Sequence, residues 1–335
     1  MSDSVKPANR LVWIDILRGV AVIGMVQTHV WNAFLHPFYD AEGWRQEWGF
    51  LSGLLAPAFL WIAGYIQGRS VRKAHRESRP VVTVPRLRRL GIIVMLAYGL
   101  HVPWNFWLAG DFSRESWRIF LQADILQCMT VSLTLLLLMG RLGSRWFDLL
   151  ALLGIAFAVF AAPAAQQWQT GTLLLDAFLN HNTGSLFPLF PWFGFCAAGC
   201  LASRWEVSWK TCLPWALAFI AVGLWLTPHG YIQPSFFFKR LGWLGLLVTA
   251  TSVISPVFAP RWVQLAGRES LLIYVVHLLL IFSLPLHGLP LNQTLGQTQS
   301  LWSSEIIFLA VLSVSLALAW GNDWRKQRQS PGKPQ

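Results

Sequence analysis

The chain has 335 residues, of which 55% are hydrophobic and 12% are charged, and its formal net charge is +11. Soluble domains carry about 25% charged residues. This composition, with a mean hydropathy of +0.48, therefore excludes an ordinary soluble protein and predicts a lipid bilayer as its surroundings. Basic residues that face one side of a membrane account for the positive charge, so no nucleic-acid partner is needed to explain it.

Apolar segments of about 20 residues are long enough to cross a bilayer as helices. We find ten candidates, near residues 11–35, 49–67, 87–108, 117–139, 147–164, 186–203, 212–227, 240–258, 269–287 and 303–321. No hydrophilic stretch between them is long enough for a separate soluble domain. The prediction is an all-α fold, a polytopic transmembrane bundle of about ten spans. It forms one domain over residues 1–324, followed by a polar, disordered tail over 325–335.

The first span contains charged residues, and no small-residue cleavage site follows it, so we expect an uncleaved span and not a signal peptide. The four cysteines lie within or beside the spans without the histidine and cysteine neighbours of a zinc site, so we expect no metal.

The distribution of lysine and arginine sets the orientation of these spans. With the N-terminus inside, the inner segments hold 20 of the 26 basic residues: Lys6, Arg10, Arg69, Arg72, Lys73, Arg76, Arg79, Arg86, Arg88, Arg89, Arg141, Arg145, Arg204, Lys210, Arg261, Arg268, Arg325, Lys326, Arg328 and Lys333. Cytoplasmic segments carry such an excess. We therefore predict that both termini are cytoplasmic, in a multi-pass protein of the bacterial inner membrane.

The first span also contains a carboxylate, a guanidinium and an imidazole, from Asp15, Arg18 and His29. A charged group at the centre of a spanning helix costs about 2.5–3.5 kcal/mol on insertion scales, so such groups face the protein interior or a watery cavity and indicate a functional site. Asp15 and Arg18 are three residues apart and share a helix face. His29 returns to that face about 16 Å farther along, near the outer surface.

Other spans bring polar groups to the outer half of the bundle. The rise per residue places the end of the third span and the start of the fourth near the level of His29. The sixth span begins with two prolines, which interrupt regular helix, and a polar stripe on the ninth reaches the middle of the membrane. The residues in question are Asn105, Asp124 and Gln127, then Trp192, and then Ser270, Tyr274 and His277.

Together these segments resemble the transmembrane acyltransferase superfamily, related to acyltransferase family 3, and within it more closely the heparan-α-glucosaminide N-acetyltransferase catalytic-domain family. The resemblance rests on the opening Arg10-x4-Asp15-x2-Arg18-Gly19 with His29, and on the order of four later segments. These are Ala56–Gly64, Asp124–Gln127, Phe187–Gly194 and Gly267–His277. It implies about ten or eleven spans, acetyl-CoA or another acyl-CoA as donor, and a sugar acceptor on the far side.

On this interpretation His29 is the catalytic base, with His36 as the alternative because it lies nearer the position of the lysosomal enzyme's histidine. Asp124 orients the imidazole, and Asn105 or Gln127 holds the oxyanion. Arg18, with Asp15 beside it, and the basic loop over 69–89 meet the CoA phosphates, while Trp192, Tyr274 and His277 contact substrate. Direct transfer and an acyl-histidine intermediate both stay open, as do O- and N-transfer.

Two other classes of function fit the same residues. A transporter or flippase for a glycan or lipid precursor would line its pathway with them, and a non-catalytic membrane scaffold would use them for packing. The absence of a visible internal repeat disfavours a transporter built from inverted repeats. The partners we expect are the bilayer, acyl-CoA and a carbohydrate acceptor, and a homodimer is left open.

Overall fold

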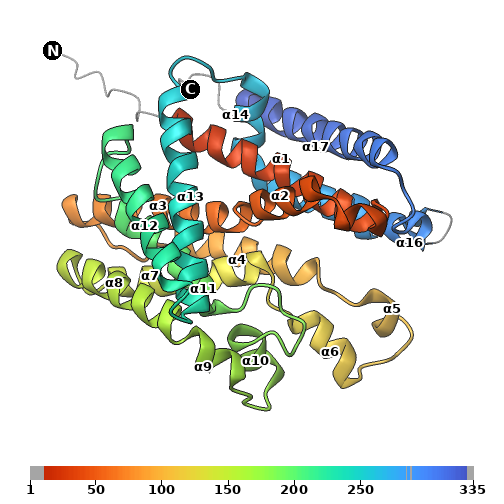
Figure 1. Ribbon diagram of the computed structural model, residues 1–335, viewed down its shortest axis with the longest axis horizontal. Helices are drawn as coiled ribbons and strands as arrows, with labels where there is room; N and C mark the ends of the chain where they lie inside the picture. The colour runs from red at the N-terminus through yellow and green to blue at the C-terminus, as the bar shows by residue number, and fades with distance from the viewer. Residues whose placement is uncertain (1–10, 284, 287–288, 330–335) are drawn as a thin grey trace. The chain divides into compact units, whose positions relative to one another are not determined.

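The protein is described from a computed structural model, which covers residues 11–283, 285–286 and 289–329 (Figure 1). Arg10, the first residue of the opening motif, and residues 330–335 of the expected tail lie outside this range. Most of the described residues are helical. The chain divides into two compact units, one of residues 1–55 with 247–335 and the other of residues 56–246. Each unit is described by itself.

The first unit is built on α1, which packs against α14, α15 and α17. Figure 1 shows α1 in red beside α17 in blue. The elements of this unit, in chain order, are α1 (Val12–Phe34), the 3₁₀ turn η1 (Pro37–Ala41), α2 (Gly43–Ser52), α14 (Arg261–Arg268), α15 (Ser270–Leu278), the π-helical turn η2 (Leu279–Ser283), β1 (Pro285–Leu286), β2 (Leu289–Pro290), α16 (Leu291–Leu295) and α17 (Leu301–Gln329).

Two glycines let α1 and α14 approach closely. A Cβ atom on Gly267 would collide with the backbone carbonyl of Asp15, and one on Gly19 would collide with the carbonyl of Val263. Small residues at such crossings bring helix backbones together inside membranes. The close contact fixes the first turns of α1, which carry Asp15 and Arg18, against the end of α14.

The chain bends by 77° where α14 gives way to α15. Glu269 is the residue at the bend, and its φ and ψ angles of −100° and 23° lie outside the helical region. After α15 the chain widens into the π-helical turn η2, and a short antiparallel pair follows, in which Pro285 of β1 pairs with Pro290 of β2. The bend leaves Ser270 at the start of α15 and His277 two turns farther on.

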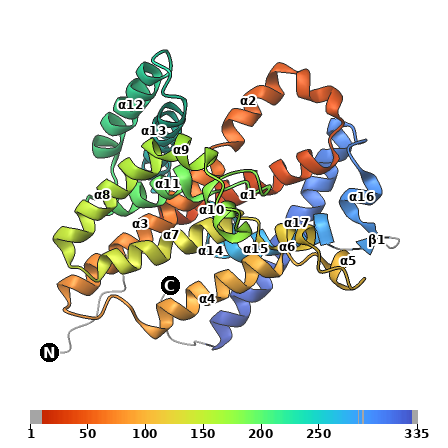
Figure 2. The same ribbon diagram turned by 90° about the horizontal axis from the view of Figure 1, so that it is seen from below.

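The second unit contains the remaining helices. They are α3 (Leu55–Arg76), α4 (Val84–Gly99), α5 (Trp104–Trp107), α6 (Arg114–Leu121), α7 (Ile125–Gly140), α8 (Ser144–Phe160), α9 (Ala162–Gln167), α10 (Leu173–Leu179), α11 (Leu189–Ala202), α12 (Trp209–Leu226) and α13 (Ile232–Ile254), whose last turns belong to the first unit. Helices α12 and α13 form a hairpin (Figure 2). Helix α11 packs against α7 and α8.

Helices α3 and α11 also meet through glycines, because a Cβ atom on Gly64 would collide with the carbonyl of Cys196 and one on Gly199 with that of Trp61. An ion-pair cluster joins α3, α8 and α11. The Arg72 guanidinium lies 2.5 Å from Asp148 and 3.1 Å from Ser203 Oγ, and Arg204 lies 2.8 Å from the other carboxylate oxygen of Asp148. Part of the basic charge predicted to face the cytoplasm therefore holds helices together.

Each of the ten segments predicted to span the membrane contains a helix, so the all-α class is confirmed. Within the described residues, four helices are long and apolar enough to cross a membrane, or six if each bent pair is one span. The predicted third span differs most, because α4 ends at Gly99 ahead of Pro103. The fourth is bent by 61° before Asp124, which caps α7. Helix α17 continues through residues 325–329 of the expected tail.

Candidate functional site

The first unit brings His29 and His277 into direct contact. The Nδ1 atom of His29 lies 2.8 Å from the Nε2 atom of His277, and the two rings are inclined by only 18°. His29 comes from the last third of α1, and His277 from the end of α15. His277 is fully buried, whereas His29 is half-buried. The pair therefore has one protected member and one accessible member.

The backbone decides which nitrogen of each ring carries a proton. The Nδ1 atom of His277 lies 2.8 Å from the carbonyl oxygen of Ile273, and a carbonyl only accepts, so Nδ1 of His277 is the donor. In a neutral imidazole the other nitrogen is then an acceptor. Nε2 of His277 thus accepts a hydrogen bond from Nδ1–H of His29. The nitrogen of neutral His29 that can take up a proton is Nε2.

Two aromatic side chains contact this pair. Tyr274, with 6% of its surface exposed, meets the His277 ring edge-on at 5.5 Å between centroids, and Phe282 meets His29 in the same way at 6.2 Å. Phe282 lies in the π-helical turn η2, and such turns occur often at functional sites. The surroundings keep bulk water from the inner histidine.

The inner end of α1 carries the second polar contact with α15. The Arg18 guanidinium donates a hydrogen bond of 2.7 Å to Ser270 Oγ. Asp15, which is 9% exposed, and Glu269 lie close enough to act on Arg18 electrostatically. Helices α1 and α15 are therefore tied at two places, by Arg18 and Ser270 at one end and by the two histidines at the other.

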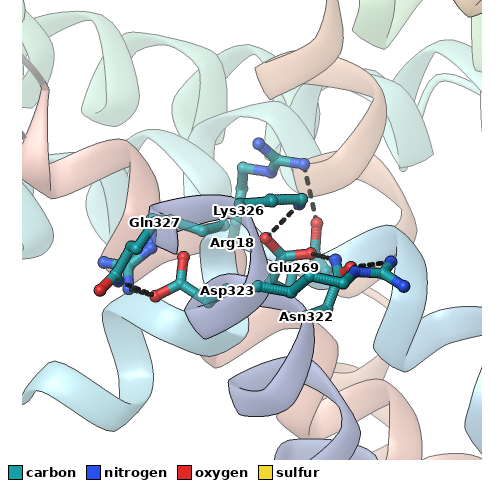
Figure 3. A network of polar contacts seen from close by, with 9 residues as sticks. Arg18, Glu269, Asn322, Asp323, Lys326 and Gln327 are labelled. Atoms are coloured by element: carbon teal, nitrogen blue, oxygen red, sulfur yellow. Dashed lines mark hydrogen bonds and ion pairs between the residues drawn. The ribbon is translucent and has the colours of Figure 1, made fainter. Parts of the chain in front are cut away.

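A network of charges from α17 surrounds the bend at Glu269 (Figure 3). The Glu269 carboxylate accepts from Lys326 Nζ at 2.6 Å and from Asn322 Nδ2 at 2.8 Å. Arg268, the residue before it, donates to Asp323 at 3.1 Å, and Gln327 donates to the same carboxylate at 2.9 Å. Two consecutive residues at the bend are thus held by the last turns of α17.

His36, the alternative base, is an exposed residue outside this arrangement. Its Nδ1 atom accepts the backbone N–H of Phe38 and so caps the 3₁₀ turn η1. A side chain that uses its lone pair to cap a turn has a sufficient structural reason to be there.

The candidates of the second unit occupy the start of α7. Asp124 is its N-cap and accepts the N–H of Ile125 at 2.7 Å, while the side chain of Gln127 reaches back to the N–H of Asp124. Gln127, only 2% exposed, also donates to the carbonyl of Ala97 at 3.1 Å and lies 3.3 Å from His101 Nδ1. Asp124 therefore acts as a helix cap, and its predicted role in orienting His29 stays a prediction.

Two further candidates of this unit lie apart from the start of α7. Asn105 is exposed on the short helix α5. Trp192 on α11 belongs to an aromatic cluster, with its ring 4.7 Å from that of Phe187, just before α11, and 5.9 Å from that of Phe236 on α13. Their predicted roles as an oxyanion donor and a substrate contact are likewise untested.

From the sequence alone, Tyr274 and His277 are expected to contact substrate, and the contact of His277 with His29 is not foreseen. The ion pair of Glu269 with Lys326 is not foreseen either. The sequence gives one indication of the histidine contact: Ser270, Tyr274 and His277 are spaced along one helix face, and the polar residues of α1 form a similar stripe. Nothing in the sequence pairs those two stripes, which are about 250 residues apart.

The family model of the acyltransferase domain, that of acyltransferase family 3, matches residues 11–321. A search of curated proteins finds no match to the chain. The family match covers both histidines, Arg18 and the bend at Glu269. With several helices apolar enough to span a bilayer, this chain is an integral membrane protein that belongs to acyltransferase family 3.

Proposed function

We propose that this acyltransferase moves an acetyl or other acyl group from cytoplasmic acyl-CoA to a hydroxyl or amine of a carbohydrate on the outer side of the membrane. The observation that carries the proposal is the hydrogen-bonded pair of His29 and His277. An imidazole titrates near neutral pH and is the usual general base in proteins. The pair provides such a base with its orientation already set.

The chemistry follows from the tautomers. The acceptor oxygen or nitrogen attacks the thioester carbonyl while His29 Nε2 takes its proton, which makes His29 an imidazolium. Nε2 of His277 accepts from the Nδ1–H of that imidazolium and stabilises it. The carbon–sulfur bond then breaks, and the imidazolium returns the proton to the leaving thiolate. An acyl-histidine formed at the same Nε2 atom is the two-step alternative.

The distance along α1 supports Arg18 as a contact for the donor's phosphates. Arg18 and His29 are eleven residues apart, which is about 16 Å along a helix. Roughly thirteen bonds separate the thioester sulfur of an acyl-CoA from its nearest phosphorus, and an extended chain advances at most ~1.2 Å per bond, giving a similar length. With Arg18 at the phosphate end, assisted by Asp15, the thioester can reach His29. Arginine suits phosphate because its N–H groups form two parallel hydrogen bonds.

For the acceptor we keep the residues singled out from the sequence. Asp124, Asn105, Gln127 and Trp192 are candidates to bind or orient a sugar, and Tyr274 is a candidate beside the histidines. The closer resemblance to the heparan-α-glucosaminide N-acetyltransferase family also favours a carbohydrate acceptor. The rival function is a transporter or flippase for a glycan or lipid precursor.

One comparison separates the two. Cell-envelope glycans are analysed by mass spectrometry from cells with the wild-type protein, without it, and with His29→Gln, with His36→Ala as the matched control. We expect acetyl groups to disappear without the protein and with His29→Gln, and to persist with His36→Ala. Unchanged acetylation in all four strains would overturn the proposal. Loss of the glycan from the surface without any change in its acetylation would establish the transporter.

A further inference from the structure

Glu269 is a buried carboxylate in the first unit. It is 7% exposed and occupies the bend between α14 and α15. A buried carboxylate is costly unless it is paired and hydrogen-bonded. Its two oxygens are satisfied by Lys326 and Asn322, both from α17. Asn322 and Lys326 are four residues apart, so they share one face of α17.

The contact has a direct consequence for the neighbouring residue. Ser270 follows Glu269, begins α15 and accepts the hydrogen bond of Arg18. Fixing Glu269 therefore fixes the point at which α15 starts, and with it the partner of Arg18. The same helix delivers His277 to His29. Arg268 adds a second tie from the bend to Asp323 of α17.

We infer that Glu269 is a positioning residue, which the end of α17 holds in place so that Ser270 keeps the Arg18 guanidinium where the phosphates of the acyl donor bind. The inference rests on the proposed function for the identity of the donor. Beyond the proposed function, the inference links α17 to the donor site: α17 holds Glu269, and Glu269 positions Ser270, which accepts the hydrogen bond of Arg18. The central side chains of this contact are shown in Figure 3.

The test compares three variants of the full-length protein in lipid nanodiscs. Lys326→Met removes the cation that Glu269 accepts from, while Lys326→Arg restores a donor at the same place. Arg325→Met is the matched control, because Arg325 is the neighbouring cation and its hydrogen bond, of 3.0 Å, goes to Asn322 Oδ1 and not to the Glu269 carboxylate. Lys326 is 58% exposed at its side chain, so its replacement is expected to leave the fold intact.

The first readout is amide hydrogen exchange, which needs no ligand. We expect Lys326→Met to speed exchange at the start of α15, around Ser270 and Ile273, and to leave the helices of the second unit unchanged. Arg325→Met and Lys326→Arg should match the wild type. Unchanged exchange at the start of α15 in Lys326→Met would overturn the inference, whether or not the protein binds acyl-CoA.

The second readout is equilibrium binding and turnover with radiolabelled acetyl-CoA. We expect Lys326→Met to raise the Kd and KM for acetyl-CoA about tenfold, the effect of losing roughly 1.4 kcal/mol of binding, with kcat and its pH profile nearly unchanged. A lower kcat with an unchanged KM would overturn the inference and leave the acyltransferase proposal standing. Absence of acetyl-CoA binding by the wild type would contradict the proposed donor, and the exchange experiment would still decide on the contact.

Discussion

The Nδ1 atom of His29 donates a hydrogen bond of 2.8 Å to the Nε2 atom of His277, whose own Nδ1–H is held by the carbonyl of Ile273. The direction of the chain of hydrogen bonds is set by that carbonyl. In the proposed mechanism the buried imidazole of His277, in its neutral form, takes the orienting role that a carboxylate has in a serine-hydrolase triad. It supports the basic nitrogen of His29 without placing a second charge beside it.

Replacement of His29 should abolish most of the acyl transfer. We expect His29→Ala to lower the rate at least about 100-fold, the low end for a general acid–base residue, while the protein still inserts and binds acyl-CoA. His36→Ala should have little effect, because that side chain is exposed and caps η1. The measurement is acetyl transfer in membranes containing equal amounts of each variant. If both variants keep full activity, the base is neither histidine.

Kinetics can show whether His277 orients His29 or instead contacts the substrate. His277→Ala should lower kcat about tenfold or more, since removing one partner of a buried hydrogen bond costs about 1–3 kcal/mol. His277→Gln retains an acceptor oxygen and should recover part of the loss. A pH profile of kcat for the three proteins checks the assignment. If only KM rises in both variants, His277 contacts the substrate and does not orient His29.

The close crossing of α1 and α14 predicts a severe effect of one methyl group. Gly267→Ala would drive a Cβ atom into the Asp15 carbonyl, and overpacking of this kind costs about 1–3 kcal/mol. Gly321→Ala is the control, since a Cβ at Gly321 meets no atom within 4 Å and alanine favours helix. Thermal unfolding of the purified proteins should rank Gly267→Ala well below wild type. Equal melting temperatures for the two variants would contradict the packing.

Stability near the turn before α10 should depend on pH. The backbone N–H of Thr170, assisted by its hydroxyl, donates to Asp176 and lowers the pKa of that carboxyl from its ordinary value of 3.8. A lowered pKa contributes stability that is present above pH 4 and is lost as the pH falls through the lowered value. Hydrogen exchange of α10 in wild type and Asp176→Asn should therefore differ at pH 6 and converge in stronger acid. A difference that grows on acidification would contradict this.

Orientation in the membrane is testable with one cysteine. The excess of basic residues predicts that both termini and the loop over 69–89 are cytoplasmic. Cys128, Cys196 and Cys200 are buried, so a Cys212→Ser background leaves Glu77→Cys as the accessible thiol. An impermeant maleimide should label Glu77→Cys in inverted vesicles and not in intact cells. Labelling of intact cells would reverse the assigned topology.

The parts of the fold that the sequence predicted well are those set by local pattern. The first span, expected over 11–35, is α1 over Val12–Phe34, because a long and mostly apolar run whose charged residues share one helix face leaves few alternatives. The third span ends early because a proline disfavours helix in the residues before it. The residues after Gly99 are also mostly apolar, so hydropathy alone extended the predicted span to residue 108.

The parts that sequence did not predict depend on distant partners. His29 and His277 are 248 residues apart, and neither residue type specifies the other. Residues 325–329 are polar, which by composition favours disorder. In the structure they continue α17, and Lys326 among them meets a buried carboxylate. A partner of that kind outweighs local composition, and only the folded chain reveals it.

The contact at Glu269 also bears on where this domain can be cut. The family match stops at residue 321, one residue before Asn322 and five before Lys326. A fragment trimmed to that boundary would keep every residue of the histidine pair and still lose both donors to the Glu269 carboxylate. Fusion partners or purification tags should therefore be attached beyond Gln329, the last residue of α17.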